Sequence, residues 1–191
     1  MADVLVLSHS AGRRLLAATM FLIALALGLA ANVAMAANPA AIVVDADTGA
    51  VIYESNSRGQ NYPASLTKMM TLYLLFEALE RKKLSLNSQL EVSSSAAQQP
   101  PTNIRLQAGE RLSVEKAIQA LVVHSANDVA AVIAESLGGT ESNFAGKMTR
   151  KAKELGMKET VFRNASGLPS AGQVTTARDM AILARALIAR F

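Results

Sequence analysis

From Pro63 to Lys83 the chain reads PASLTKMMTLYLLFEALERKK, a continuous helical pattern. Proline suits the first turn of a helix, where its missing N–H would have had no partner, so we expect a helix that begins at Pro63. The middle of the stretch, residues 69–76, is apolar on nearly every side, which is typical of a helix buried inside a domain. Polar residues from Lys82 onward close the pattern. The sequence therefore predicts one buried helix over residues 63–83.

Lys68 is the only charged residue between Arg58 and Glu77, and it lies near the start of this helix. Burying an ammonium group is costly and lowers its pKa, which allows a lysine to act as a general base near neutral pH. Ser65 lies one helical turn earlier on the same face, near the positive end of the helix dipole. We therefore expect Ser65 to be a nucleophile activated by Lys68, without any histidine.

The four-residue pattern alone is weak, because the chain repeats it at Ser113-Val114-Glu115-Lys116. Ser113 follows a loop and precedes an amphipathic run, which predicts a helix N-cap with Lys116 in solvent. The structural alternative for Ser65 and Lys68 is similar: a serine in a first helical turn and a lysine that extends to water. A further polar cluster is needed to separate the two interpretations.

Residues 124–128, His-Ser-Ala-Asn-Asp, lie between two apolar helical stretches. Polar residues in such a place are expected to pair with one another or to have a function. Ser125 offers a hydroxyl that can pass on a proton, and Asn127 offers an amide that can hold Lys68 or a substrate carbonyl. We therefore expect these two residues to meet Ser65 and Lys68 in one site.

The remaining pattern combines one hairpin with helices. Strand-like runs at 41–45 and 50–54 flank the sequence Asp-Ala-Asp-Thr-Gly at 45–49. This segment predicts a β-turn rather than a calcium loop, because the spacing lacks further oxygen ligands and a distal glutamate. Residues 85–108 look irregular. Further helices are expected from Ser113 to Val123, from about Asn127 to Leu137, over residues 141–155, and from Thr175 or Thr176 onward. The prediction is an α+β domain with a single visible hairpin.

The first 36 residues have the pattern of a secretory signal. An Arg13-Arg14 pair precedes an uncharged apolar run over residues 15–31, and Ala34-Met35-Ala36 offers small residues at the two positions a signal peptidase recognises. We expect export across the inner membrane and, over residues 37–191, the N-terminal part of a mature catalytic domain, with a retained membrane anchor as the alternative. Cytosolic cofactors such as ATP are not expected in that compartment.

Composition narrows the chemistry further. The 191 residues include no cysteine, which excludes disulfides, thiolate nucleophiles and cysteine-bound metals. The histidines are His9 and His124, and His9 lies in the predicted signal, so a Ser-His-Asp triad or a histidine zinc site has one candidate imidazole left. The formal charge of +4 is too small to indicate nucleic-acid binding. We expect neither a cofactor nor a metal.

Taken together and in order, these motifs resemble the penicillin-recognising serine enzymes, and most closely the low-molecular-mass D-alanyl-D-alanine carboxypeptidases of serine peptidase family S11. The resemblance covers about residues 38–190. It is carried by residues 45–49, 63–69, 108–114 with 125–130, 162–169 and 176–181. It implies a β-lactamase/transpeptidase-like fold in which Ser65 forms the acyl-enzyme and Lys68 accepts the proton. It further implies that Ser125 relays the proton, that Asn127 binds the substrate or the lysine, and that His124 is structural.

The resemblance also implies a substrate and a location. The substrate is the peptidoglycan stem pentapeptide that ends in D-Ala-D-Ala, and β-lactam antibiotics such as penicillin act as acylating inhibitors. The expected location is the periplasm, with membrane association through a C-terminal region.

One motif of the resembled family does not occur. The 191 residues contain no Lys-Thr-Gly, Lys-Ser-Gly or His-Thr-Gly, and the last helical pattern runs to Phe191 without a capping residue. We therefore expect a chain that stops before the C-terminal strands of its domain, either as a fragment or as a truncated reading frame.

Three alternatives stay open at this point. A D,D-endopeptidase of the same family would use the same residues on cross-linked peptides. A class A β-lactamase is disfavoured, because residues 159–164 do not match the Glu-x-x-Leu-Asn segment expected of one and the second motif is Ser-Ala-Asn rather than Ser-Asp-Asn. An inactive wall-binding or penicillin-sequestering fragment would fit the missing third motif.

Overall fold

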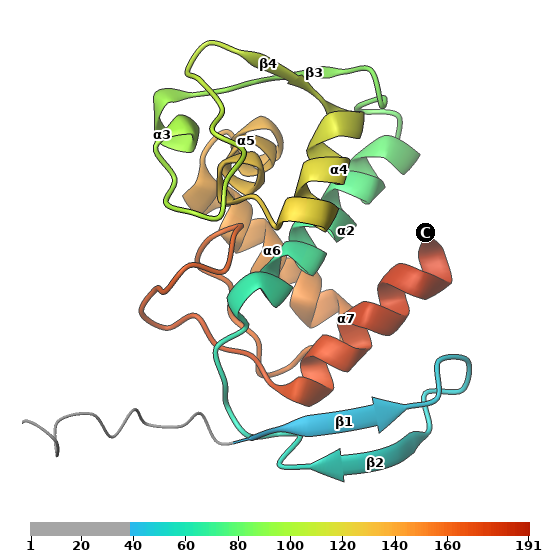
Figure 1. The fold of residues 1–191 in the computed structure, drawn as a ribbon. Helices are drawn as coiled ribbons and strands as arrows, with labels where there is room; N and C mark the ends of the chain where they lie inside the picture. Colours follow the sequence, from blue (N-terminus) through green and yellow to red (C-terminus); the bar gives the residue numbers. More distant parts are fainter. Residues whose placement is uncertain (1–38) are drawn as a thin grey trace, which may run out of the picture. The chain divides into compact units, whose positions relative to one another are not determined.

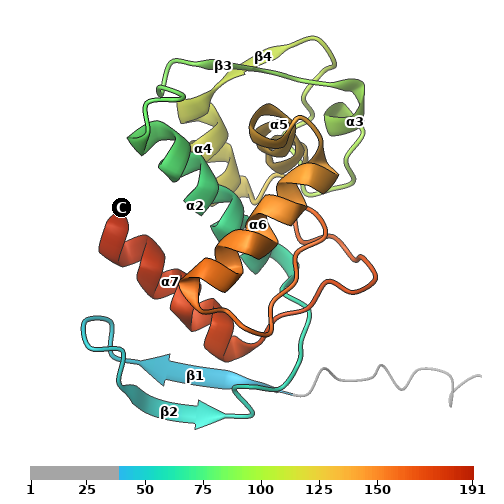
Figure 2. The same cartoon turned by 180° about the vertical axis from the view of Figure 1, so that it is seen from behind.

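The computed structural model describes residues 39–191, and the predicted signal segment lies outside them. In chain order the elements are β1 (Ala41–Val44), β2 (Val51–Ser55), a 3-10 turn η1 (Ala64–Leu66), α2 (Thr67–Glu80), β3 (Gln89–Glu91), α3 (Ser94–Ala97), β4 (Arg111–Ser113), α4 (Val114–His124), α5 (Asn127–Gly138), α6 (Glu141–Leu155) and α7 (Ala177–Arg190). Figures 1 and 2 show the two small sheets at opposite ends, with the helices between them. None of the helices within residues 39–191 has the length and apolar character needed to cross a membrane.

The core is centred on α5. Every residue from Val129 to Ala134 is at most 2% exposed, so this helix is covered on all sides. Helices α2, α4 and α6 and the short α3 pack against it. The predicted burial of α2 is confirmed for most of its length: Met70 and Leu75 are fully buried, whereas Leu66, just before the helix, is 53% exposed. Helix α2 thus enters the core from an exposed turn.

The prediction of one continuous helix from Pro63 was wrong at its N-terminal end. Residues 64–66 form a 3-10 turn, and the α-helix begins only at Thr67. The backbone of Ala64 has a φ of +45°, in the left-handed region, which an α-helix cannot include. The helical hydrophobic pattern is the same for both conformations, so the sequence does not reveal the break.

The expected β-hairpin is confirmed. Strands β1 and β2 pair antiparallel, with Val43 opposite Tyr53. The Asp45 carboxylate accepts hydrogen bonds from the Thr48 amide and hydroxyl, both at 2.7 Å, as the turn interpretation of residues 45–49 required. From α7, Arg185 donates to the carbonyl oxygens of Ala46 and Asp47, each at 3.0 Å, so the last helix holds the hairpin turn.

The prediction of a single hairpin, with residues 85–108 irregular, was wrong. Strands β3 and β4 form a second two-stranded antiparallel sheet, in which Leu90 lies opposite Leu112. Each strand has only three residues, too few for a recognisable alternation, and their pairing crosses about twenty residues of intervening chain. The buried side chains of Leu90 and Leu112 join this sheet to the core.

Candidate active site

Ser65 lies in the exposed 3-10 turn, directly above the buried start of α2. Its side chain is open to solvent, whereas Lys68 is only 4% exposed. The residue before it, Ala64, holds the left-handed backbone conformation, which costs a residue other than glycine about 1–3 kcal/mol and is often found at functional sites. This turn presents the Ser65 hydroxyl to incoming molecules while the lysine approaches it from the protein side.

Lys68 is held by two strong hydrogen bonds and one weak one. Its Nζ donates to the Asn127 Oδ1 at 2.8 Å and to the Ser166 carbonyl oxygen at 2.7 Å. The Ser65 Oγ lies 3.5 Å from the same nitrogen, at the limit of a hydrogen bond. Catalytic hydrogen bonds are often long in a free site and shorten when substrate binds. The predicted meeting of Ser65, Lys68 and Asn127 is present in the structure.

Burial changes the acidity of this lysine. Loss of contact with water lowers the pKa of Lys68 from 10.5 to about 8. At that pKa roughly a tenth of the molecules carry the neutral amine at pH 7, against fewer than about one in a thousand for an ordinary lysine. Only a neutral amine can accept a proton from a hydroxyl, so burial gives Lys68 the acidity that a general base near neutral pH requires.

Asn127 is the first residue of α5 and is fixed on both sides. Its Nδ2 donates to the Pro100 carbonyl at 2.9 Å, so the side-chain oxygen must face Lys68. Its backbone amide donates to the Thr102 carbonyl at 2.7 Å. Next to it, the buried Asp128 carboxylate accepts from the amides of Ile104 and Leu106, at 3.1 and 3.2 Å. The segment before β4 is therefore bound to the start of α5.

Ser125 lies at the bend between α4 and α5, where its φ of +53° ends the first helix. It is half-buried, and its carbonyl accepts from the Thr102 hydroxyl at 2.9 Å. Within residues 39–191, Lys68 forms hydrogen bonds with Ser65, Asn127 and Ser166 but none with Ser125. Ser125 precedes Asn127 by two residues in the sequence, and its neighbour His124 is exposed on the last turn of α4.

The second Ser-x-x-Lys copy has the structural role that was predicted for it. Ser113 caps α4 by accepting from the Lys116 amide at 3.3 Å, and the Lys116 side chain is exposed. Burial therefore distinguishes Lys68 from Lys116.

The Ser166 carbonyl belongs to the site but was not predicted from the sequence. Residues 162–169 were noted only as a segment of the resemblance, and a backbone oxygen has no side-chain signature. Gly167 was the available signal. With a φ of +90°, it packs so closely on the turn before Ser65 that a Cβ would overlap the Ala64 carbonyl group. Only glycine fits in such a place.

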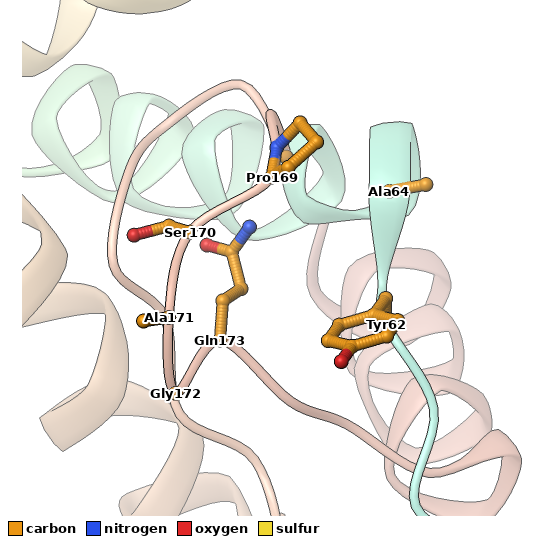
Figure 3. Close-up of a pocket in the computed structure, with 8 residues that line it drawn as sticks. Tyr62, Ala64, Pro169, Ser170, Ala171, Gly172 and Gln173 are labelled. Atoms are coloured by element: carbon orange, nitrogen blue, oxygen red, sulfur yellow. The ribbon is translucent and has the colours of Figure 1, made fainter.

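A hollow of about 610 Å³ opens beside this turn (Figure 3). It is lined by Tyr62, Ala64, Gly167, Pro169, Ser170, Ala171, Gly172 and Gln173. Ser65 and Lys68 are not among the lining residues, so the hollow adjoins the reactive pair without containing it. Within residues 39–191, no group of three or more His, Asp or Glu side chains is placed to hold a metal ion.

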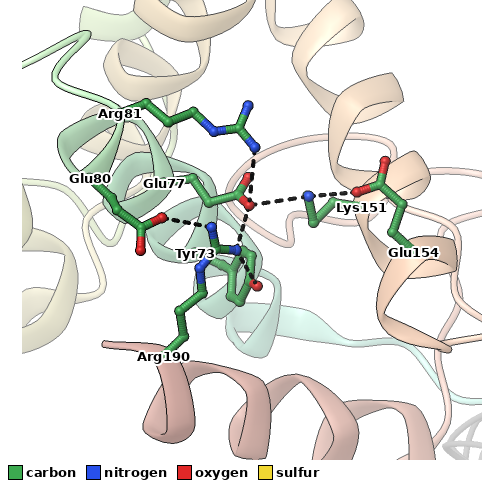
Figure 4. Close-up of polar contacts among 7 residues, drawn as sticks. All are labelled: Tyr73, Glu77, Glu80, Arg81, Lys151, Glu154 and Arg190. Atoms are coloured by element: carbon green, nitrogen blue, oxygen red, sulfur yellow. Dashed lines mark hydrogen bonds and ion pairs between the residues drawn. The ribbon is translucent and has the colours of Figure 1, made fainter.

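A second charged cluster surrounds Glu77 at the far end of α2 (Figure 4). Arg190 donates to its Oε1 at 2.7 Å, and Lys151 lies 3.2 Å from the same oxygen. Burial of Glu77 favours its neutral form, but the hydrogen bonds from Arg190 and Lys151 outweigh burial and lower the pKa of Glu77. The cluster joins α2 to α6 and α7, and its members bind one another, so we assign it to stability.

Solved structures with a similar fold include a D-alanyl-D-alanine carboxypeptidase and a penicillin-binding protein. The structure superposes on D-alanyl-D-alanine carboxypeptidase DacD from Francisella tularensis with a TM-score of 0.79 and 38% identity, over 80% of this chain and 37% of that chain. Penicillin binding protein 5 from Haemophilus influenzae gives a TM-score of 0.75 and 31% identity, over 78% of this chain and 44% of that chain. The fold is the predicted α+β, transpeptidase-like one.

The sequence places the chain more narrowly. D-alanyl-D-alanine carboxypeptidase DacF from Bacillus subtilis is 39% identical over 148 residues, which are 78% of this chain and 38% of that protein. Residues 28–190 match peptidase family S11, described as D-alanyl-D-alanine carboxypeptidase. The chain belongs to this family, as the resemblance implied. It spans about two fifths of the length of the curated relative.

Proposed function

We propose that the protein is a serine-type D-alanyl-D-alanine carboxypeptidase, which removes the terminal D-alanine from peptidoglycan stem pentapeptides. One observation carries the proposal: a buried lysine with a lowered pKa lies against an exposed serine, and an asparagine holds that lysine in place. A serine next to a desolvated amine is an activated nucleophile. Family membership supports the choice of substrate.

The first step forms an ester. The Ser65 Oγ attacks the carbonyl carbon between the two D-alanines, and its proton passes to the neutral Lys68 Nζ. The C–N bond then breaks, and the departing D-alanine amine takes up the proton from the lysine. The family resemblance assigns the relay of this proton to Ser125, although Lys68 donates to Ser65, Asn127 and Ser166 and not to Ser125 in the free site. The peptide remains as an acyl group on Ser65, and free D-alanine leaves.

The second step returns the enzyme to its starting state. Water attacks the ester carbonyl, its proton goes to Lys68, and the shortened peptide leaves as a carboxylic acid while Ser65 regains its hydrogen. Asn127 keeps the lysine pointed at Ser65 throughout, because Pro100 fixes the orientation of its amide. Penicillin would enter the first step through its strained amide and leave a stable ester.

The missing third motif affects the expected rate. In the resembled family that motif helps to form the oxyanion hole, and the loss of one oxyanion donor reduces a rate by about 100- to 1000-fold. We therefore expect slow acylation within these 191 residues, still directed to Ser65. We further propose export to the periplasm, on the strength of the signal-like residues 1–36.

The test is labelling of the 191-residue chain with a fluorescent penicillin, followed by peptide mapping. We expect label on Ser65 that is lost in Ser65→Ala. The matched control is Ser113→Ala, which removes the serine of the second Ser-x-x-Lys copy and should leave the label unchanged. Label on another residue of the folded chain, or label that survives Ser65→Ala, would contradict the proposal. Release of D-alanine from a stem pentapeptide, measured on the same samples, tests the substrate.

A further inference from the structure

The loop over residues 161–174 is a closed unit with an amide side chain inside it. Val161 and Val174 pair at its neck through backbone hydrogen bonds of 2.9 and 3.1 Å. Gln173 lies just inside the neck and is only 2% exposed. Glutamine is mostly found on protein surfaces, and a buried amide has to be fully hydrogen-bonded. Its partners therefore show what the side chain does.

Gln173 binds both limbs of the loop. Its Oε1 accepts from the amides of Arg163 and Asn164, at 3.0 and 3.3 Å, on the incoming limb. Its Nε2 donates to the Leu168 carbonyl at 3.0 Å on the outgoing limb. Asn164 adds a second link, because its side-chain Nδ2 donates to the Leu168 carbonyl at 2.8 Å and its Oδ1 accepts from the Gly167 backbone amide at 2.7 Å.

The tip between these limbs lies against the reactive lysine. The Ser166 carbonyl accepts from Lys68 at 2.7 Å, so its position decides where the amine points. The preceding residue, Ala165, is fixed from two helices. Its amide donates to Glu141 of α6 at 3.0 Å, and its carbonyl accepts from Thr71 of α2 at 2.8 Å.

We propose that Gln173 is a positioning residue of the active site, which ties the two limbs of the loop together and so holds the Ser166 carbonyl and the loop tip over Lys68. This inference rests on the proposed function for its catalytic meaning. Its physical content, the placement of the loop on Lys68, does not depend on turnover. No apolar side chain could replace the hydrogen bonds of Gln173, because the amides of Arg163 and Asn164 would lose the acceptor that Gln173 gives them, and the Leu168 carbonyl would keep only its bond from Asn164.

The acidity of Lys68 reports on this placement. The carboxylates on the neighbouring helices are bound to other groups: Asp128 of α5 accepts from Ile104, and Glu141 of α6 accepts from Ala165. Burial is the cause of the lowered pKa of Lys68. If the loop tip moves away, water reaches the ammonium and its pKa rises toward the ordinary value.

The test is an NMR titration of the lysine side chains in the 191-residue chain, with the Lys68 signal assigned from its loss in Lys68→Met. In Gln173→Met we expect the pKa of Lys68 to rise by about one unit or more from its starting value. The matched control is Gln119→Met, the same change at an exposed position on α4, for which no shift is expected. A purely structural Gln173 would lower the melting temperature and leave the pKa of Lys68 in place, and that result would overturn the inference.

A second variant covers the case in which Gln173→Met does not fold. Asn164→Ala removes the other link between the limbs. A rise in the pKa of Lys68 in this variant would support the inference, and an unchanged pKa would contradict it. Penicillin labelling separates this inference from the proposed function. Absence of label on Ser65 with a shifted pKa would reject the function alone, whereas label on Ser65 with an unshifted pKa in the variant would reject the positioning role alone.

Discussion

Substitution of Gly167 by alanine should destabilise the chain and displace the turn that carries Ser65. An added Cβ would overlap the Ala64 carbonyl group, and the φ of +90° is unfavourable for alanine. The backbone strain costs about 1–3 kcal/mol, and forcing the Ala64 turn to move costs about 1–3 kcal/mol more. The matched control is Gly109→Ala, at a φ of +86° with no atom within 4 Å of the added Cβ, which carries the strain alone.

The assay is urea unfolding of both variants and of the unaltered chain, analysed by linear extrapolation. We expect Gly167→Ala to lose about 1–3 kcal/mol more free energy of unfolding than Gly109→Ala. Penicillin acylation of Ser65 should slow by about 100-fold in Gly167→Ala only, since a shift of about 1 Å at a reactive group can cost that much. Equal losses in the two variants would refute the packing of Gly167 on the turn before Ser65.

The rate of Ser65 acylation should rise about tenfold per pH unit and level off above about pH 8, because burial lowers the pKa of Lys68 to about 8 and only the neutral amine accepts a proton. A rate that stays constant between pH 6 and 9 would argue against a lysine base. Glu77→Gln should lower the free energy of unfolding by about 2 kcal/mol, because it weakens the contacts with Arg190 and Lys151, whereas Glu80→Gln at an exposed ion pair should cost less than about 1 kcal/mol. Because the pKa of Glu77 is lowered in the folded chain, its carboxylate stabilises the fold at any pH above its unfolded-state pKa. The stability difference between Glu77→Gln and the unaltered chain, measured by thermal denaturation, should therefore disappear as the pH falls through the lowered pKa.

Much of the site was predictable because its members carry chemical signatures. Ser65 and Lys68 are one helical turn apart in an otherwise apolar run, and that placement made burial of the lysine the expected outcome. Asn127 was predictable as a polar residue between two buried helical stretches. The structure confirms that these three side chains meet.

Other parts depended on long-range contacts that sequence patterns do not encode. The Ser166 carbonyl reaches Lys68 across 98 positions in the chain, and a backbone oxygen is common to every residue. The buried Glu77 depends on Arg190, 113 positions away. The break before α2 depends on the left-handed backbone conformation of Ala64, and an alanine in the sequence does not indicate such a conformation. The structure was therefore needed to place the loop, the ionic cluster and the turn.

The most direct test of the central claim is the pKa of Lys68 itself, measured by NMR titration of the ε-carbons of isotope-labelled lysines in the folded 191-residue chain. The measurement needs neither substrate nor turnover, so a slow reaction cannot obscure it. We expect the Lys68 signal, identified by its absence from Lys68→Met, to titrate near pH 8. If Lys68 instead titrates near its ordinary value of 10.5, it is not the buried base that activates Ser65.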